Sequence, residues 1–129
     1  MRADADDLVQ ELGSLLMEDG DLLANPWEHL VIVAQFRPLS IKVNGFAYLA
    51  NGKAIPTSPS GVAVTKKFQE LREATKEPAK DVWQAAMVKI EKSSGSLSID
   101  FEYDNPDKWL ISPATVKRMA EALRPTAKA

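Results

Sequence analysis

The chain has 129 residues, 45% of them hydrophobic and 26% charged, which fits a single globular domain. It has no cysteine, which excludes disulfides, thiolate metal sites and cysteine nucleophiles. A net charge of −2 and a pI of about 5.4 argue against nucleic acid as a direct ligand. Residues 1–10 contain no apolar signal segment, and no apolar run approaches the roughly 20 residues that span a bilayer, so the sequence predicts a cytoplasmic protein without membrane contact.

The charge is divided unevenly along the chain. Residues 1–36 carry eight acids against one base, a net charge of −7, whereas the remaining fifteen bases and ten acids give +5. A block of like charge usually forms a solvated face, but it can also steer a basic partner towards the protein. The acids of this block are Asp4, Asp6, Asp7, Glu11, Glu18, Asp19, Asp21 and Glu28.

The acidic block begins with a predicted amphipathic helix over residues 4–17. Leu8, Leu12 and Leu16 recur at helical spacing and give it one apolar stripe. Acids crowd its first turn, where the positive end of the helix dipole favours them. Gly20 is expected to follow the end of this helix.

Three strands are predicted next, over residues 27–36, 40–50 and 53–56. The first is a continuous apolar and β-branched run, which predicts a strand covered on both faces or nearly so. In the second, Gly45 is expected to mark a bulge. Asn51-Gly52 favours a type I′ hairpin turn, and the proline in the third strand indicates a sheet edge.

The second half of the chain predicts a helix, a hairpin and a last helix. Apolar residues at helical spacing predict a helix over residues 64–76. Alternating apolar residues then predict two strands over 83–92 and 96–103. Ser112 and Pro113 provide a hydroxyl cap and a proline at the first helical position, and begin a helix that runs to about residue 123.

The predicted order of elements is α-β-β-β-α-β-β-α. Short connections between strands favour antiparallel pairing, so the expected class is α+β, an antiparallel sheet of about five strands with helices packed on one face. Residues 1–125 are interpreted as one domain, and residues 126–129 as a flexible tail.

No residue set suited to catalysis, metal binding or cofactor binding is found. His29 is the single histidine, and no second histidine, cysteine or close carboxylate pattern supplies further metal ligands. No serine lies in a nucleophile elbow, and no glycine-rich phosphate loop occurs. His29 is therefore interpreted as an ordinary strand residue, and the chain as a protein without enzymatic activity, metal or cofactor.

A second group of acids lies on the outward face of the last strand and just beyond it. Charges are the default outer residues of a sheet, and cross-strand pairs with Lys89 and Glu91 would explain part of the pattern. The functional alternative is that this group and the first helix form an acidic docking surface. Its members are Asp100, Glu102, Asp104 and Asp107.

The three tryptophans border strands or turns. Trp27 and Trp83 are expected in the core, as most large aromatic residues are. Trp109 follows an acidic turn and precedes the last helix, so we expect it to be partly exposed. An exposed aromatic side chain beside acids is a candidate interface anchor.

Spaced aromatic and apolar motifs run through nearly the whole chain. They are Pro-Trp-Glu-His-Leu at 26–30, Gly-Phe-Ala-Tyr at 45–48, Phe-Gln-Glu-Leu at 68–71, Trp83, Val-Lys-Ile-Glu at 88–91 and Gly-Ser-Leu-Ser-Ile-Asp-Phe-Glu-Tyr-Asp at 95–104. Their order and spacing resemble the YezG-like immunity proteins of bacterial polymorphic toxin and contact-dependent growth inhibition systems. Residues 106–109 and the helix after them depart from that pattern.

The resemblance implies a protein that binds and neutralises the toxic C-terminal domain of a cognate bacterial toxin by one-to-one occlusion. Such a domain is often a nuclease, and nucleases need basic surfaces to hold phosphates. An acidic protein can imitate that charge and cover the active site. The expected partner is therefore basic where it docks, and a monomer is the expected free state.

Two other functions remain open at this point. A chaperone of the type III secretion class is also small and acidic, but it is normally a dimer with exposed apolar grooves. The predicted second helix, residues 64–76, is rich in charge and does not favour such a dimer seam. A small enzyme that uses the strand carboxylates would need at least one carboxyl pKa strongly raised.

The residues predicted to contact the partner come from both acidic groups and the exposed aromatic side chain. They are Asp7, Glu11, Glu18, Asp19, Asp21, Asp100, Glu102, Asp104, Asp107 and Trp109.

Overall fold

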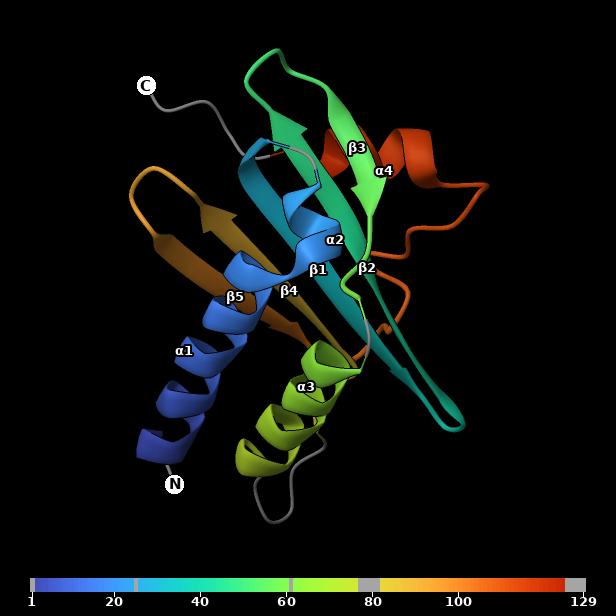
Figure 1. Ribbon diagram of the computed structural model, residues 1–129. Helices are drawn as coiled ribbons and strands as arrows, with labels where there is room; N and C mark the ends of the chain where they lie inside the picture. The colour runs from blue at the N-terminus through green and yellow to red at the C-terminus, as the bar shows by residue number, and fades with distance from the viewer. Residues whose placement is uncertain (1, 25, 61, 77–81, 125–129) are drawn as a thin grey trace.

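An antiparallel sheet of five strands organises the fold (Figure 1). The structure is a computed structural model and describes residues 2–24, 26–60, 62–76 and 82–124. Every neighbouring pair of strands is antiparallel, as the short connections predict. In spatial order the strands are β3 (Ala54–Thr57), β2 (Ser40–Leu49), β1 (Trp27–Arg37), β4 (Ala85–Glu91) and β5 (Ser96–Glu102).

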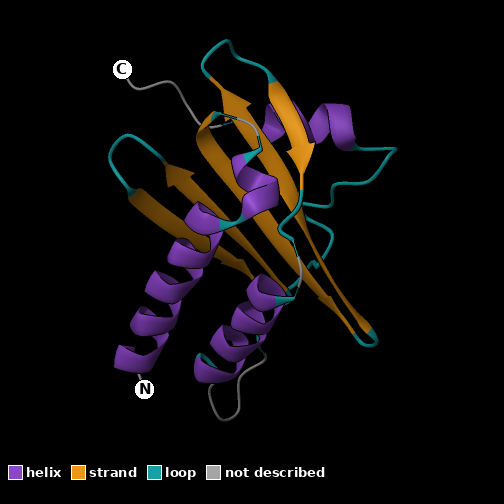
Figure 2. Cartoon of the chain, in the orientation of Figure 1, coloured by secondary structure: helices purple, strands orange, loops and turns teal. Residues whose placement is uncertain are grey.

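Helices lie on both faces of this sheet (Figure 2). The elements α1 (Arg2–Glu18), α2 (Gly20–Leu23) and α3 (Ala63–Ala74) cover one face, and α4 (Val116–Ala122) covers the other. The α+β class and the predicted order are confirmed, with α2 as one added turn. Only α4 departs from the expectation that the helices share one face. The tail expected at 126–129 lies outside the described residues, and none of the described helices is long and apolar enough to cross a membrane.

The strand β1 needs cover on both faces because its consecutive residues 30–34 are all apolar. Leu30, Ile32 and Ala34 point towards α1 and α3, and Val31 and Val33 point towards α4. All five are fully buried. Leaving either set in water would forfeit roughly 1.5–3 kcal/mol for each large side chain. The burial on both faces that the sequence predicts is therefore confirmed, and it explains why α4 lies apart from the other helices.

Each face of the sheet has its own hydrophobic core. On the first, Leu12 of α1 and Phe68 of α3 pack against the strands. Trp27 and Trp83 belong to this core, as predicted, and each is 1% exposed. The second core joins strand residues to the C-terminal part of the chain. Its buried members are Val31, Val33, Phe46, Tyr48, Ala85, Met87, Trp109, Ile111, Met119 and Leu123.

Gly45 does not mark a bulge. It lies opposite Ile32 in an unbroken register between β1 and β2, and the irregularity lies instead between Trp27 and His29. Gly45 is needed for a close approach, because a Cβ atom built on it would lie 1.8 Å from the carbonyl oxygen of Val31. The absence of a side chain lets the two strands pair at this point.

The turn predicted at Asn51-Gly52 joins β2 to β3, but it is not the two-residue type I′ turn. The Gly52 N–H donates to Leu49 O and the Leu49 N–H donates to Lys53 O, each at 2.9 Å, and Gly52 has φ of 90°. These bonds enclose three residues, with the glycine in the left-handed position at the end of the loop.

Gly45→Ala is expected to destabilise the fold by about 3 kcal/mol or more, because the new methyl group would overlap backbone rather than a movable side chain. Gly20→Ala is the matched control, since no atom lies within 4 Å of its Cβ position. We expect that change to stay within about 0.5 kcal/mol. Urea unfolding followed by circular dichroism measures both, and equal stability of the two variants would contradict the close approach.

Candidate protein-binding surface

The exposed side of α1 carries an acidic stripe, which consists of Asp6, Asp7, Glu11 and Glu18. Asp7, Glu11 and Glu18 recur at helical spacing, and all four side chains are exposed. Glu11 pairs with Lys67 Nζ at 2.6 Å. Within the described part of the chain, Asp6, Asp7 and Glu18 make no ion pair. The α1 stripe therefore keeps most of its negative charge.

A groove of about 600 Å³ runs beside this stripe, between α1 and α3. Lys67 reaches Glu11 of α1 and Glu70 of α3, at 2.6 and 2.8 Å. Hydrogen bonds to Glu11 first, and then to Glu70, raise the pKa of Lys67, which therefore stays charged at neutral pH. The groove is mainly apolar and is lined by Gln10, Glu11, Ser14, Leu15, Glu18, Ala63, Lys66, Lys67 and Glu70.

Asp19 has an internal role instead of the exposed one that was predicted. It is only 9% exposed, and its Oδ1 accepts the N–H of Leu22 at 3.1 Å. Its Oδ2 accepts the N–H and the hydroxyl of Ser60, at 2.8 and 3.0 Å. Asp19 thus caps α2 and ties it to the loop before α3. The side chain of Asp21 lies outside the described residues.

The acids of β5 lie on the opposite face of the sheet from α1. Asp100 is paired with Met87 and Glu102 with Ala85, and both of these partners belong to the core under α4. Lys89 lies opposite Ser98 and not opposite an acid, which corrects the predicted cross-strand pairing. The two acidic groups therefore lie on opposite faces of the sheet.

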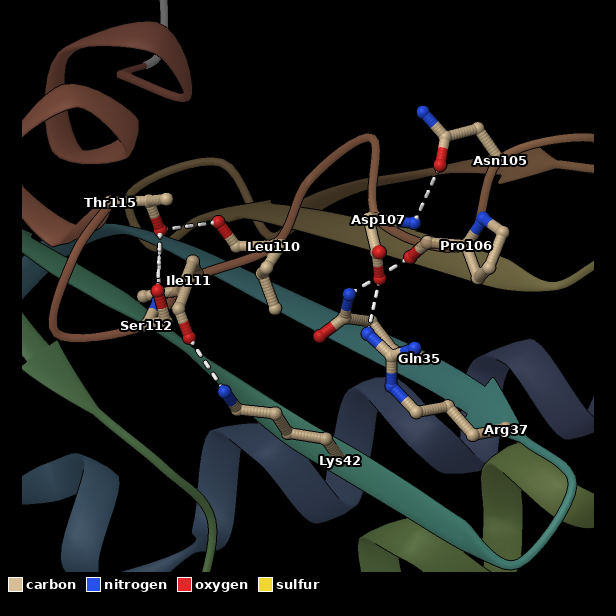
Figure 3. A network of polar contacts seen from close by, with 10 residues as sticks. All are labelled: Gln35, Arg37, Lys42, Asn105, Pro106, Asp107, Leu110, Ile111, Ser112 and Thr115. Atoms are coloured by element: carbon tan, nitrogen blue, oxygen red, sulfur yellow. Dashed lines mark hydrogen bonds and ion pairs between the residues drawn. The ribbon is translucent and has the colours of Figure 1, made fainter.

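Polar side chains of β1 and β2 hold the segment 104–115 against the sheet (Figure 3). Gln35 Nε2 donates a hydrogen bond to the carbonyl of Pro106 at 2.8 Å. Lys42 Nζ donates one to the carbonyl of Ile111, also at 2.8 Å. The sequence signal for this contact is Gln35, a polar residue directly after the apolar run 30–34, and the structure buries it fully. Gln35 is not among the residues predicted to have a role.

Of the three predicted contact residues in this segment, Asp107 and Trp109 are engaged there. Asp107 pairs with Arg37 of β1. Trp109 is only 8% exposed and belongs to the core under α4, so the expectation of a partly exposed anchor is wrong. That core also contains Val31 and Val33 of β1, and Lys108 Nζ lies 5.5 Å from the Trp109 ring centroid.

The carboxylate of Glu102 accepts hydrogen bonds from the loop that follows β5. Its Oε2 accepts the N–H groups of Asp104 and Asn105, each at 3.1 Å, and its Oε1 lies 3.3 Å from Lys108 Nζ. The N–H of Asn105 and then that of Asp104 lower the pKa of this carboxyl, with a smaller contribution from Lys108. A lowered pKa is the opposite of what acid–base catalysis by Glu102 would require. Asp100 and Asp104 are exposed.

His29 lies at the start of β1 with its Nε2 3.4 Å from Glu91 Oε2. In the parts of the chain that the structure describes, no three histidine, aspartate or glutamate side chains are grouped to hold a metal ion. A nucleophilic or metal site requires more than one histidine and one carboxylate.

No protein-family model matches the chain, and no curated protein sequence matches it.

Asp19→Ala is expected to destabilise the protein by about 1–3 kcal/mol, because it leaves the buried N–H of Leu22 and the part-buried N–H of Ser60 without an acceptor. Glu18→Ala is the matched control on the adjacent, exposed position. Its effect should stay within about 0.5 kcal/mol. Thermal or urea unfolding measures both, and an Asp19→Ala variant as stable as the control would disprove the internal role.

The amide signals of Asp104 and Asn105 should follow the ionisation of Glu102 in an NMR titration between neutral and acid pH. Because the folded pKa lies below the ordinary value, the contacts are complete above the unfolded pKa of about 4.3 and are lost as pH falls through the folded pKa. In Glu102→Gln this titration should vanish. A midpoint above the ordinary glutamate value would contradict the hydrogen-bonded geometry.

Proposed function

We propose that this chain is an immunity protein that binds the toxic domain of a cognate bacterial toxin and neutralises it by one-to-one occlusion, without catalysis. The observation that carries the proposal is the α1 stripe, whose Asp6, Asp7 and Glu18 have no counter-charge among the described residues. A surface of this kind favours a partner that is basic where it docks.

The stripe also lies beside a mainly apolar groove. Binding surfaces commonly combine an apolar centre with a polar rim. Here Leu15 and Ala63 contribute to the groove between the helices, and Glu18 lines its edge. The long-range attraction of the acids would raise the association rate, while the groove offers apolar area to be buried. A nuclease domain, whose substrate site must be cationic, suits both features.

The kind of partner is taken from the resemblance of the sequence motifs to the YezG-like immunity proteins. The alternative, a chaperone of the type III secretion class, would need an apolar dimer seam. On α3 the exposed residues include Lys66, Glu70 and Glu73, which favour contact with water over such a seam. Sedimentation of the free protein distinguishes the two, because the chaperone interpretation requires a stable dimer.

The direct experiment is co-expression with the C-terminal domain of the toxin encoded beside this chain in its genome. We expect a one-to-one complex on purification, and we expect the chain to restore growth of cells that produce the toxic domain. Absence of a toxin gene there, or a toxic domain that is neither bound nor neutralised, would contradict the proposal.

Asp7→Lys combined with Glu18→Lys should slow association with that toxic domain by roughly tenfold at low salt and weaken the salt dependence of the rate. Both positions are exposed, so the fold should be kept. Stopped-flow or surface plasmon resonance measures the rate.

Glu28→Lys combined with Glu73→Lys is the matched control, with the same change in net charge at exposed positions off the α1 stripe. If the control slows association less than the double change on α1, the charges that guide docking lie on the α1 stripe. Equal effects would show that only net charge matters and would contradict a role for the stripe.

A further inference from the structure

The two edges of the sheet are protected very differently. The edge strand β3 has four residues and contains Pro56, which cannot donate to a neighbouring strand. The other edge strand, β5, has seven residues, pairs with β4 in unbroken register and contains neither proline nor lysine. Natural proteins usually block an open edge with such residues or with a bulge. The edge of β5 is therefore the one suited to accept another strand.

The apolar face of β5 is only partly covered. Leu97, Ile99 and Phe101 are half-buried on the side of the sheet that carries α1. In Figure 1, α1 crosses in front of β5. Gly13 permits this close approach, because a Cβ atom on it would lie 2.6 Å from Leu97 Cδ1.

A groove of about 360 Å³ lies where α1 crosses the β4–β5 hairpin. The half-buried Val9 and Met17 of α1 and Leu97 of β5 line it. The apolar side chains of a strand added beside β5 would lie on this face of the sheet, next to Leu97 and close to α1. The groove therefore offers a place to bury the apolar half of an incoming segment.

The opposite face of β5 is acidic at its centre. Asp100 is exposed, pairs across the sheet with Met87, and makes no ion pair within the described residues. The position opposite Asp100 on an added strand would favour lysine or arginine. A second copy of this chain fits less well. Antiparallel pairing of two β5 strands about Ile99 would set their two Asp100 side chains diagonally across, roughly 7–8 Å apart.

We propose that the free edge of β5 binds an extended segment of a partner protein that alternates apolar and basic residues, as a sixth strand of the sheet. Backbone hydrogen bonds would supply affinity, and the alternation would supply specificity. The inference rests on the proposed function only in taking the partner to be cationic where it docks.

The first test uses a blocked seven-residue peptide of alternating lysine and valine as the probe, with a glutamate and valine peptide as its counterpart. On titration into the full chain, NMR should show shifts and slowed exchange at amides of β5, with smaller changes on the facing side of α1. The glutamate peptide should bind roughly tenfold more weakly. No shift at β5, equal binding of both peptides, or shifts confined to the α1 stripe would overturn the proposal.

Asp100→Lys should reverse the preference, so that the glutamate peptide binds better than the lysine peptide. Glu73→Lys is the matched control, with the same change in net charge on α3, and it should keep the wild-type order. Asp100→Asn provides a second variant that should abolish the preference if the lysine variant does not fold. An unchanged preference in the variant that folds, or self-association of the chain through β5 in sedimentation, would refute the proposal.

These results are separable from the proposed function. If the peptides do not bind at β5 while reversal of Asp7 and Glu18 still slows association with the toxic domain, the edge-strand inference fails and the proposed function stands. If the lysine peptide binds at β5 and the toxic domain is not bound, the edge-strand inference stands and the proposed function fails.

Discussion

Burial of β1 on both faces is the constraint on which the rest of the structure depends. Because Leu30 and Ile32 point one way and Val31 and Val33 the other, the sheet needs a layer on each side. The helices α1 and α3 supply one layer, and the segment that ends in α4 supplies the other. The side chains on the inner face of each layer are buried in the core. Only the outer faces of the two layers and the edge of the sheet are available to a partner.

This division explains why acids that look alike in the sequence differ in the structure. The acids of the α1 stripe point away from the sheet, since the opposite side of the helix buries Leu12 and Leu16. The acids near the segment 104–115 lie where the chain itself must be fastened to the sheet. Glu102 and Asp107 are used there to hold the loop, through backbone N–H groups and Arg37. The charges at these two positions stabilise the fold, because they are engaged in contacts within the chain.

The spacing of apolar residues predicts the strands and helices here, because the side chains that an element buries recur along its own sequence. The five strands, the antiparallel order and the core positions of Trp27 and Trp83 follow from it. Contacts between distant segments do not follow. Trp109 looks exposed beside its acidic turn, yet it is buried in one core with Val31 and Val33 of β1, and no local pattern predicts that long-range packing. Asp19 likewise accepts hydrogen bonds from Ser60, 41 residues further along the chain, and this contact could not be read from the acidic block.

The most direct measurement is hydrogen–deuterium exchange of the purified complex with the toxic domain, compared with the free chain. If a basic partner docks on the side of α1 and at the neighbouring sheet edge, exchange should slow at amides of α1 and β5. It should stay unchanged in α4 and in the segment 104–115. Slowing confined to α4 and that segment would contradict this location of the binding surface.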